Sequence, residues 1–205
     1  RELDRLAAIF AAERVDIILL PGDIINDRPE AFYAEGMAPH LQALRAPLGV
    51  FGTLGNHEFY GDADENARAL REGGVQVLRD AVAVVADRVV VVGRDDDTNS
   101  ARPSLAALLK DVRRDLPVLV LDHRPTEILA NVQTPMDIQV SGHAHNGQVF
   151  PANFIVRALY RLHYGHEQID GKEIFVSSGY GFWGVPLRLG SRSEVFVIDV
   201  TGRKD

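Results

Sequence analysis

The stretch "DIQVSGHAHNGQ" (residues 137–148) joins a short apolar run to two histidines that stand two positions apart. Ile138 and Val140 alternate with polar residues, which predicts a strand and puts the histidines in the loop at its carboxyl end. Loops at the carboxyl ends of strands carry the chemistry of many α/β proteins. Taken alone, the stretch is better explained as a polar turn whose histidines only form hydrogen bonds.

Polar clusters of the same kind follow three earlier apolar runs. They are "GDIIN" (22–26), "GNHEFYGD" (55–62) and "LDHRP" (121–125). Each places a carboxylate, amide or imidazole directly after an apolar run, and side chains in such positions converge on one edge of a sheet. A structural role is the better explanation for any single residue: Asp23 as a helix cap, Asn56 in a left-handed turn, His123 as a core histidine.

Four such clusters together favour a shared site over four unrelated turns. Mixed aspartate, asparagine and histidine ligands suit manganese, iron or zinc, whereas an all-oxygen set would suit magnesium or calcium. The chain contains no cysteine, which excludes thiolate ligands, disulfides and a cysteine nucleophile.

The order of apolar runs and helical segments predicts the fold class. Strands are expected at 15–21, 48–54, 75–78, 88–93, 116–123, 137–141, 173–178 and 194–200. Helices are expected at 1–14, within 29–45, and near 62–72 and 103–114. This order predicts an α/β fold with two stacked sheets and helices outside. The 205 residues, 46% of them hydrophobic, suffice for one core, so we expect a single domain over 1–205.

The net charge of the chain bears on which molecules it can bind. At −7 it gives no reason to expect binding to nucleic acid, which is driven by lysine and arginine. An anionic substrate then needs a local positive centre, such as metal ions. The chain contains no run of about 18 apolar residues, the length needed to span a membrane. It also has no recognisable signal peptide, so we expect the 205-residue chain itself to be soluble.

"GDIIN", "GNHE", His123 and "GHAHNGQ", in this order, resemble the calcineurin-like metallophosphoesterase family. The pattern of that family is D-x-H, G-D-x-x-D, G-N-H-E/D, H and G-H-x-H, and the resemblance covers nearly the whole chain. It implies a four-layer α/β/β/α sandwich with a binuclear metal site at strand ends. It also implies a metal-dependent phosphoester hydrolase that uses a hydroxide shared between two divalent ions, with manganese, iron or zinc as the expected metals.

The resemblance assigns five metal ligands: Asp23, Asn56, His123, His143 and His145. Asp23 would bridge both ions and His145 would bind the second, while the other three complete the first. His57 would stay off the metals, close to the substrate phosphate, where an imidazole can donate a proton to the departing alkoxide or stabilise phosphoryl charge. Glu58 is a candidate for orienting an imidazole or for contacting substrate; an exposed loop carboxylate is an equally good interpretation.

Two positions depart from the pattern of the family. D-x-H, which would give the second metal an aspartate and a histidine, is absent before "GDIIN". Because the first helix, "RELDRLAAIFAAER", has no cap or turn before it, we expect a chain whose first strand, with those ligands, lies upstream of residue 1. The alternative is a degraded metal site. Asn26 stands where the family has aspartate, at a position outside the metal ligands.

The C-terminal third, "SSGYGFWGVPLRLGSRSEVFVIDV" (177–200), resembles a bacterial branch of membrane-associated phosphoesterases. In that branch the catalytic domain often follows transmembrane helices or an export signal, and some members cleave phosphodiester or pyrophosphate bonds of lipid-linked envelope compounds. The resemblance implies a membrane anchor upstream of residue 1. Arg188 is a candidate contact for the substrate phosphate, because a planar guanidinium pairs well with phosphate; a surface ion pair is equally plausible.

The segment "FIVRALYRLHYG" (154–165) has apolar residues on one helical face and two arginines on another. A basic amphipathic helix near the active-site loop suits a membrane surface or an acyl chain. A helix packed on the domain, with solvated Arg157 and Arg161, is the slightly better explanation.

The leading function is hydrolysis of phosphodiester or pyrophosphate bonds. The absent D-x-H motivates an alternative, a non-catalytic phosphate-binding domain, but His57 argues against it because a binder needs no positioned proton donor. The net charge disfavours a nuclease on the same fold, and a protein phosphatase stays open. The sequence predicts no oligomeric state.

Overall fold

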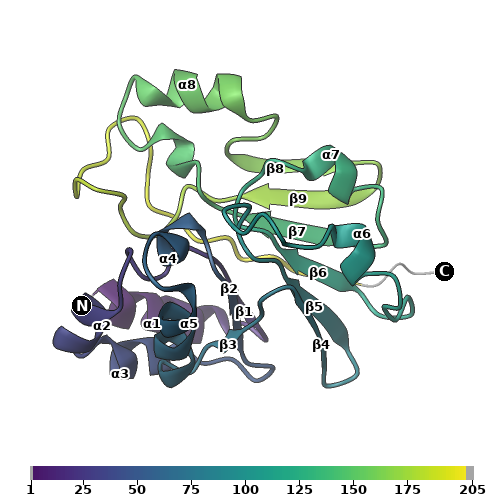
Figure 1. The fold of residues 1–205 in the computed structure, drawn as a ribbon, viewed down its shortest axis with the longest axis horizontal. Helices are drawn as coiled ribbons and strands as arrows, with labels where there is room; N and C mark the ends of the chain where they lie inside the picture. The colour runs from purple at the N-terminus through teal and green to yellow at the C-terminus, as the bar shows by residue number, and fades with distance from the viewer. Residues whose placement is uncertain (1, 202–205) are drawn as a thin grey trace.

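The computed structural model describes residues 2–201, which form two β-sheets with helices on their outer faces (Figure 1). The smaller sheet is parallel, in the order β1 (Ile18–Pro21), β2 (Val50–Thr53), β3 (Gln76–Val77). The helices of this half are α1 (Glu2–Glu13), α2 (Glu30–Ala34), α3 (Met37–Gln42), α4 (Asn56–Tyr60) and α5 (Ala63–Glu72).

The larger sheet has the order β4-β5-β6-β7-β9-β8. Its strands are β4 (Ala81–Val85), β5 (Val89–Gly93), β6 (Val118–Leu121), β7 (Ile138–Ser141), β8 (Gly165–Ile169) and β9 (Lys172–Val176). The four central strands are parallel, and each outer strand pairs antiparallel with its neighbour. The remaining helices are α6 (Leu105–Leu108), α7 (Ile128–Asn131), the 3₁₀ turn η1 (His145–Gly147) and α8 (Ala152–Leu159).

The two sheets pack face to face, with β1 against β6 and β7 and with β2 against β5. Between them Phe51, Val91 and Leu121 form a buried cluster. Each such side chain contributes roughly 1.5–3 kcal/mol when it leaves water. Separate apolar clusters join helices to the outer face of each sheet: α1, α3 and α5 on the small sheet, α6 and α7 on the large one. The order helices, sheet, sheet, helices confirms the predicted four-layer α/β/β/α sandwich.

Helix α5 shows how local sequence sets an element. The Asp62 carboxylate accepts hydrogen bonds from the N–H groups of Asp64 and Glu65, which caps the helix start. Ala67 and Leu70 stand three apart and are buried against the small sheet. The helix ends before Gly73, and the next residue, Gly74, has a φ of +86°, which favours glycine.

Two predicted strands differ from the structure. Strand β1 is shorter than 15–21 and only Ile18 is buried, whereas Leu19, Leu20 and Pro21 are half-buried. The predicted strand at 194–200 is not a strand. Together with α1, these two segments line a groove of about 530 Å³. Within the described residues β1 is the edge strand of its sheet, and because both β1 and 194–200 line this groove, 194–200 does not pair with that edge.

Helix lengths also differ from the prediction. The helix expected within 29–45 is two helices, α2 and α3, because Gly36 between them has a φ of +60°. The helix expected at 103–114 is only the short α6, capped by Ser104. Strands β4 and β8 were not predicted from the sequence.

Candidate metal centre

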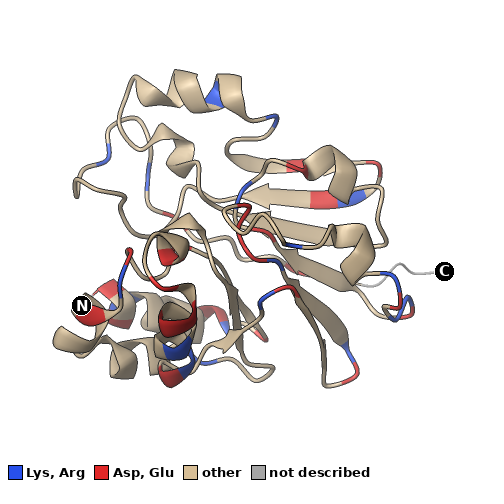
Figure 2. Ribbon diagram, viewed as in Figure 1, with Lys and Arg blue, Asp and Glu red and all other residues tan. Residues whose placement is uncertain are grey.

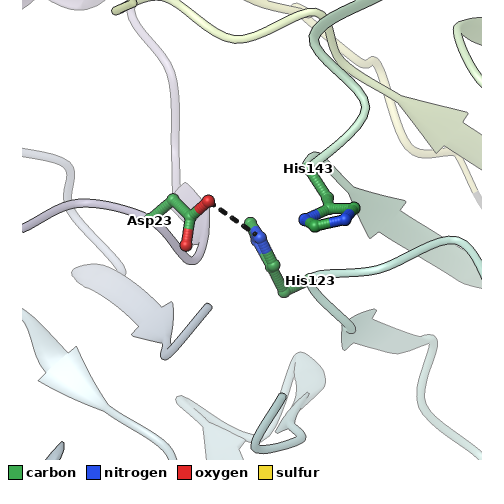
Figure 3. Close-up of side chains that lie close together, drawn as sticks. All are labelled: Asp23, His123 and His143. Atoms are coloured by element: carbon green, nitrogen blue, oxygen red, sulfur yellow. Dashed lines mark ion pairs between the residues drawn. The ribbon is translucent and has the colours of Figure 1, made fainter. Parts of the chain in front are cut away.

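Four strand-end loops meet at one place between the sheets. Asp23 follows β1, Asn56 follows β2 at the start of α4, His123 follows β6 and His143 follows β7. Figure 3 shows Asp23, His123 and His143 pointing toward one another. A ligand atom from each of these three lies within 4.8 Å of the other two. The structure thus brings together side chains that stand far apart in the chain, as their positions after strands predict.

His123 turns one ring nitrogen, Nε2, toward two oxygen atoms, while the other, Nδ1, faces a backbone carbonyl. Its Nδ1 lies 2.7 Å from the Pro21 carbonyl oxygen, which can only accept, so Nδ1 carries a proton. Its Nε2 lies 3.1 Å from Asp23 Oδ2 and 3.2 Å from Asn56 Oδ1. A neutral His123 would therefore turn a lone pair toward a carboxylate, and a positive charge, a proton or a metal ion, is needed between them.

The pKa values of His123 and Asp23 also indicate that a positive charge lies between them. Burial opposes the charged form of His123, but the hydrogen bond and charge of Asp23 outweigh it, so the His123 pKa is raised. Burial also raises the pKa of Asp23, and the hydrogen bond and charge of His123 reverse this and lower it to about 2. Asp23 is therefore ionised at neutral pH and ready to bind a cation.

The two histidines of the quoted stretch are neutral. Burial, and next the charges of His123 and Arg124, lower the pKa of His143 to about 4. Burial, and next the charge of Arg188, lower the pKa of His145 to about 4. Neutral imidazoles offer lone pairs to a metal.

His145 lies outside the cluster of three but on the same cleft. Its Nδ1 is buried and has no hydrogen-bond partner among the described residues. An unsatisfied buried polar atom costs about 1–3 kcal/mol, and a ligand to that nitrogen would recover this cost. Three features fit divalent metal ions of the manganese, iron and zinc type. They are the unpaired nitrogen of His145, the two oxygen atoms that face His123, and the mixture of Asp, Asn and His ligands.

The prediction made for Glu58 is wrong. Its side chain is fully buried, so it does not lie on an exposed loop or face substrate in the cleft. Among the described residues, its hydrogen-bond partners are backbone N–H groups and not an imidazole. Its carboxylate accepts hydrogen bonds of 2.6–3.0 Å from the N–H groups of Asp23, Ile24, Ile25 and Gly55. Burial, and next the charge of Asp23, raise the pKa of Glu58 to about 7, while the N–H donors act in the opposite direction. Glu58 holds the loop that presents Asp23.

Two glycines let the loops after β1 and β2 touch. A Cβ on Gly55 would lie 2.2 Å from Asp23 Oδ1, and one on Gly22 would lie 2.6 Å from the Gly55 nitrogen. Gly22 also has a φ of +91°, which side chains disfavour. The glycines beside these polar residues are therefore required for the contact between the loops.

His57 lies in the cleft beside the cluster but is not one of its three members. Its backbone N–H donates to Asp23 Oδ1 at 3.0 Å. Its ring Nδ1 lies 3.1 Å from Asp27 Oδ1, and the Tyr60 ring packs edge-on against it. The role predicted for His57, close to the phosphate and off the metals, stays a prediction.

Arg188 is not among the cleft-lining residues. Its Nη2 donates to the carbonyl oxygens of Ser178, Gly179 and Gly181 at 2.6–3.0 Å. Within the described part of the chain it forms no ion pair either. Its donors hold the loop after β9, so the position of Arg188 supports neither the predicted phosphate contact nor the surface ion pair.

The cleft above the cluster has a volume of about 330 Å³ and is lined by two kinds of residue. The polar ones are Asp23, Asn56, His57, His143 and His145. The aromatic and apolar ones include Tyr60, Val156, Leu159, Tyr160 and Trp183. The cleft therefore offers both polar and apolar contacts.

The sequence did not reveal the role of Gln148, which closes the quoted stretch. Its buried side chain accepts a hydrogen bond from the Trp183 N–H and donates to the carbonyl oxygens of Trp183 and Val185. It thereby fixes the wall of the cleft that Trp183 forms. The partners lie at least 35 residues away, so no local pattern identifies them.

Comparison with known proteins identifies the family of this chain. The family model of calcineurin-like phosphoesterase matches residues 1–147. An uncharacterized metallophosphoesterase from Aquifex aeolicus is 29% identical over 208 residues, covering 98% of this chain and 78% of that protein. A transmembrane protein with metallophosphoesterase domain from Bos taurus is 30% identical over 213 residues, covering 95% of this chain and 48% of that protein. The chain spans about half the length of several curated relatives that it matches.

A solved structure, the 5'-nucleotidase precursor from Thermus thermophilus, matches with a TM-score of 0.57. The match covers 87% of this chain and 42% of that chain at 19% identity, so it concerns the fold alone. The family model, in contrast, matches well over half of the chain. This chain therefore belongs to the calcineurin-like phosphoesterase family, whose members are phosphoric ester hydrolases.

Proposed function

We propose that this protein hydrolyses phosphodiester or pyrophosphate bonds with two divalent metal ions, and that its substrates carry a lipid-like group. The observation that carries the proposal is that four of the five candidate ligands line one cleft together with His57, while the fifth, His123, lies buried beside Asp23 and Asn56. Family membership supports the general activity, metal-dependent phosphoester hydrolysis.

Asp23 is the candidate bridging ligand, because a bridge between two cations must carry charge and the pKa of about 2 keeps Asp23 ionised. Asn56, His123 and His143 would complete the ligands of one ion, and His145 would bind the other. A pair of divalent ions, when bound, makes hydroxide available at neutral pH and neutralises charge on the phosphoryl oxygens.

His57 is the candidate proton donor. Asp27 Oδ1 lies within hydrogen-bond distance of its Nδ1, and because a carboxylate accepts, Nδ1 carries the proton of this hydrogen bond. As an imidazolium the ring would also carry an N–H on Nε2, which can donate to the leaving oxygen or to a phosphoryl oxygen. The Tyr60 ring, edge-on against it, restricts its orientation.

The apolar side of the cleft supports the choice of a lipid-linked substrate. Val156, Leu159 and Trp183 form an apolar wall of the cleft that the candidate ligands also line, and they offer no charge to a second polar group. No helix of the described residues is long and apolar enough to cross a membrane. The proposal of membrane association rests on the apolar wall of the cleft. The name of the Bos taurus relative supports it.

Replacement of His57 separates an enzyme from a phosphate-binding module. The measurement is turnover of an aryl phosphodiester, an aryl phosphomonoester and pyrophosphate by the manganese-loaded chain, together with its metal content. His57→Asn is expected to lower turnover by a factor of about 10²–10⁴ and to leave metal content unchanged.

His40→Asn is the matched control, since His40 lies on α3 outside the cleft and its partner is Asp4. It should leave turnover unchanged. If the metal-loaded parent chain hydrolyses none of the three substrates yet binds phosphate, the binding module replaces the proposed hydrolase.

A further inference from the structure

Helix α8 is apolar on two sides and none of its residues is buried. One side, with Ala152 and Val156, lines the cleft. Another side turns Phe154 and Ile155 to solvent with exposed fractions of 59% and 60%, and Leu159, at the mouth of the cleft, is 70% exposed. Large apolar side chains on an amphipathic helix normally face the core. The better explanation from the sequence is a helix packed on the domain with solvated Arg157 and Arg161, but in α8 the large apolar side chains are solvated as well.

A second exposed apolar segment lies beside α8, in the loop 182–189. Its large apolar residues, among them Trp183 at 59% and Val185 at 66%, are all more than half exposed. The two segments are joined, because the Phe150 N–H donates to the Leu189 carbonyl at 2.7 Å and Gln148 holds the backbone around Trp183. We call the exposed apolar side chains of 150–159 and 182–189 the apolar rim.

The apolar rim lies in the basic part of an acidic chain. Neither residues 142–166 nor residues 174–193 contain an aspartate or glutamate, although the net charge of the whole chain is −7. The same stretches contain Arg157, Arg161, Arg188 and Arg192, and Figure 2 shows the basic positions on α8 and the adjoining loop. Arg157 and Arg192 form no ion pair with any residue of 2–201.

We propose that the apolar rim docks on the surface of a bilayer that contains anionic phospholipid. Exposed aromatic and aliphatic side chains enter the boundary between headgroups and acyl chains, and arginines beside them attract anionic lipid. A second copy of this chain fits the rim less well, because a symmetric contact would bring the same arginines together.

The cleft lies next to the apolar rim, so docking of the rim would bring the cleft to the bilayer. Leu159 and Trp183 belong both to the rim and to the apolar wall of the cleft. A docked molecule therefore opens its cleft at the level of the headgroups, where a lipid phosphate reaches the candidate ligands without leaving the bilayer. This last step rests on the proposed function, whereas docking itself does not.

Trp183 is the only tryptophan of the chain, so its fluorescence reports on the rim alone. The probe is vesicles of phosphatidylcholine and phosphatidylglycerol in equal amounts, with phosphatidylcholine alone for comparison. With the mixed vesicles we expect a blue shift of emission, quenching by brominated acyl chains and co-sedimentation of the chain. An unshifted emission with no co-sedimentation overturns the proposal. A blue shift without lipid, together with a dimer in light scattering, overturns it in favour of self-association.

Matched variants test which surface binds. Ile155 on α8 and Leu129 on α7 are both 60% exposed. Ile155→Ser should weaken partition into mixed vesicles about ten-fold, and Leu129→Ser should not change it. Arg157→Gln should weaken it roughly five-fold, whereas the exposed Arg114→Gln should not. Equal effects of the paired variants would overturn the assignment. Because partition is measured without turnover, a chain that docks but does not hydrolyse contradicts the proposed function and leaves docking intact.

Discussion

At the scale of single residues, the candidate centre depends on groups that repel one another until a cation is present. Asp23 and Asn56 both turn an oxygen toward His123 Nε2, and His145 has a buried nitrogen without a partner among the described residues. Their presence at strand ends could be predicted from the sequence, because each polar residue follows an apolar run. The role of Glu58 could not, since three of the four N–H groups that bind its carboxylate come from the distant loop after β1 and only that of Gly55 is local.

Glu58→Gln tests the role of this buried carboxylate. Each Glu58 oxygen accepts two N–H groups, so an amide would turn its NH₂ toward two donors. A buried N–H left without an acceptor costs about 1–3 kcal/mol, and for the two N–H groups we expect the free energy of unfolding to fall by about 3 kcal/mol. Metal affinity should fall as well, because Asp23 loses its support.

Urea unfolding and metal titration measure these two effects. Glu13→Gln is the control, because Glu13 is exposed at the end of α1. A Glu58→Gln variant as stable and as avid for metal as the parent chain would show that the carboxylate does not hold the loop.

At the scale of elements, a buried ion-pair network joins the ends of β5 and β6 to the loop before α7. Arg94 is 1% exposed and pairs with Asp122 at 2.7 Å and with Glu127 at 2.8 Å. The apolar pattern located β5 and β6 correctly, but it could not show that an arginine following β5 is buried. The same limit applies to 194–200, where an alternating pattern predicts a strand that lacks a neighbour to pair with in the described structure.

Arg94→Met is expected to lower the free energy of unfolding by about 3–5 kcal/mol, because the buried Asp122 charge loses a main partner. Chemical denaturation measures the change. Arg113→Met is the control: Arg113 is 45% exposed and its pairs with Asp87 and Asp115 lie at the surface. It should change stability by about 0.5 kcal/mol or less. Similar losses for both variants would contradict the importance given to the buried network.

At the scale of the whole molecule, the candidate ligands come from loops of both sheets. Asp23 and Asn56 follow strands of the small sheet, and His123 and His143 follow strands of the large one. The layered fold could be predicted from the sequence, because the order of apolar runs reflects the layers. The apolar rim could not, since only the packing of α8 decides which of its faces meets solvent.

A metal held between the two sheets should stabilise the whole molecule. At a concentration about 100 times its Kd, a ligand of the folded state adds about 2.7 kcal/mol. For a chain of this size that raises Tm by about 5–10 °C. Thermal unfolding with manganese, and then with excess chelator, measures the shift. An unchanged Tm would mean that no metal joins the sheets.

Metal content per chain, measured by elemental analysis after loading and dialysis, tests the central claim most directly. The parent chain and the His40→Ala control should retain bound manganese, iron or zinc, and His143→Ala should lose it, because His143 lies in the three-residue cluster and His40 does not. Retention of the same amount by all three chains, or of none by the parent chain, would contradict the metal centre described above.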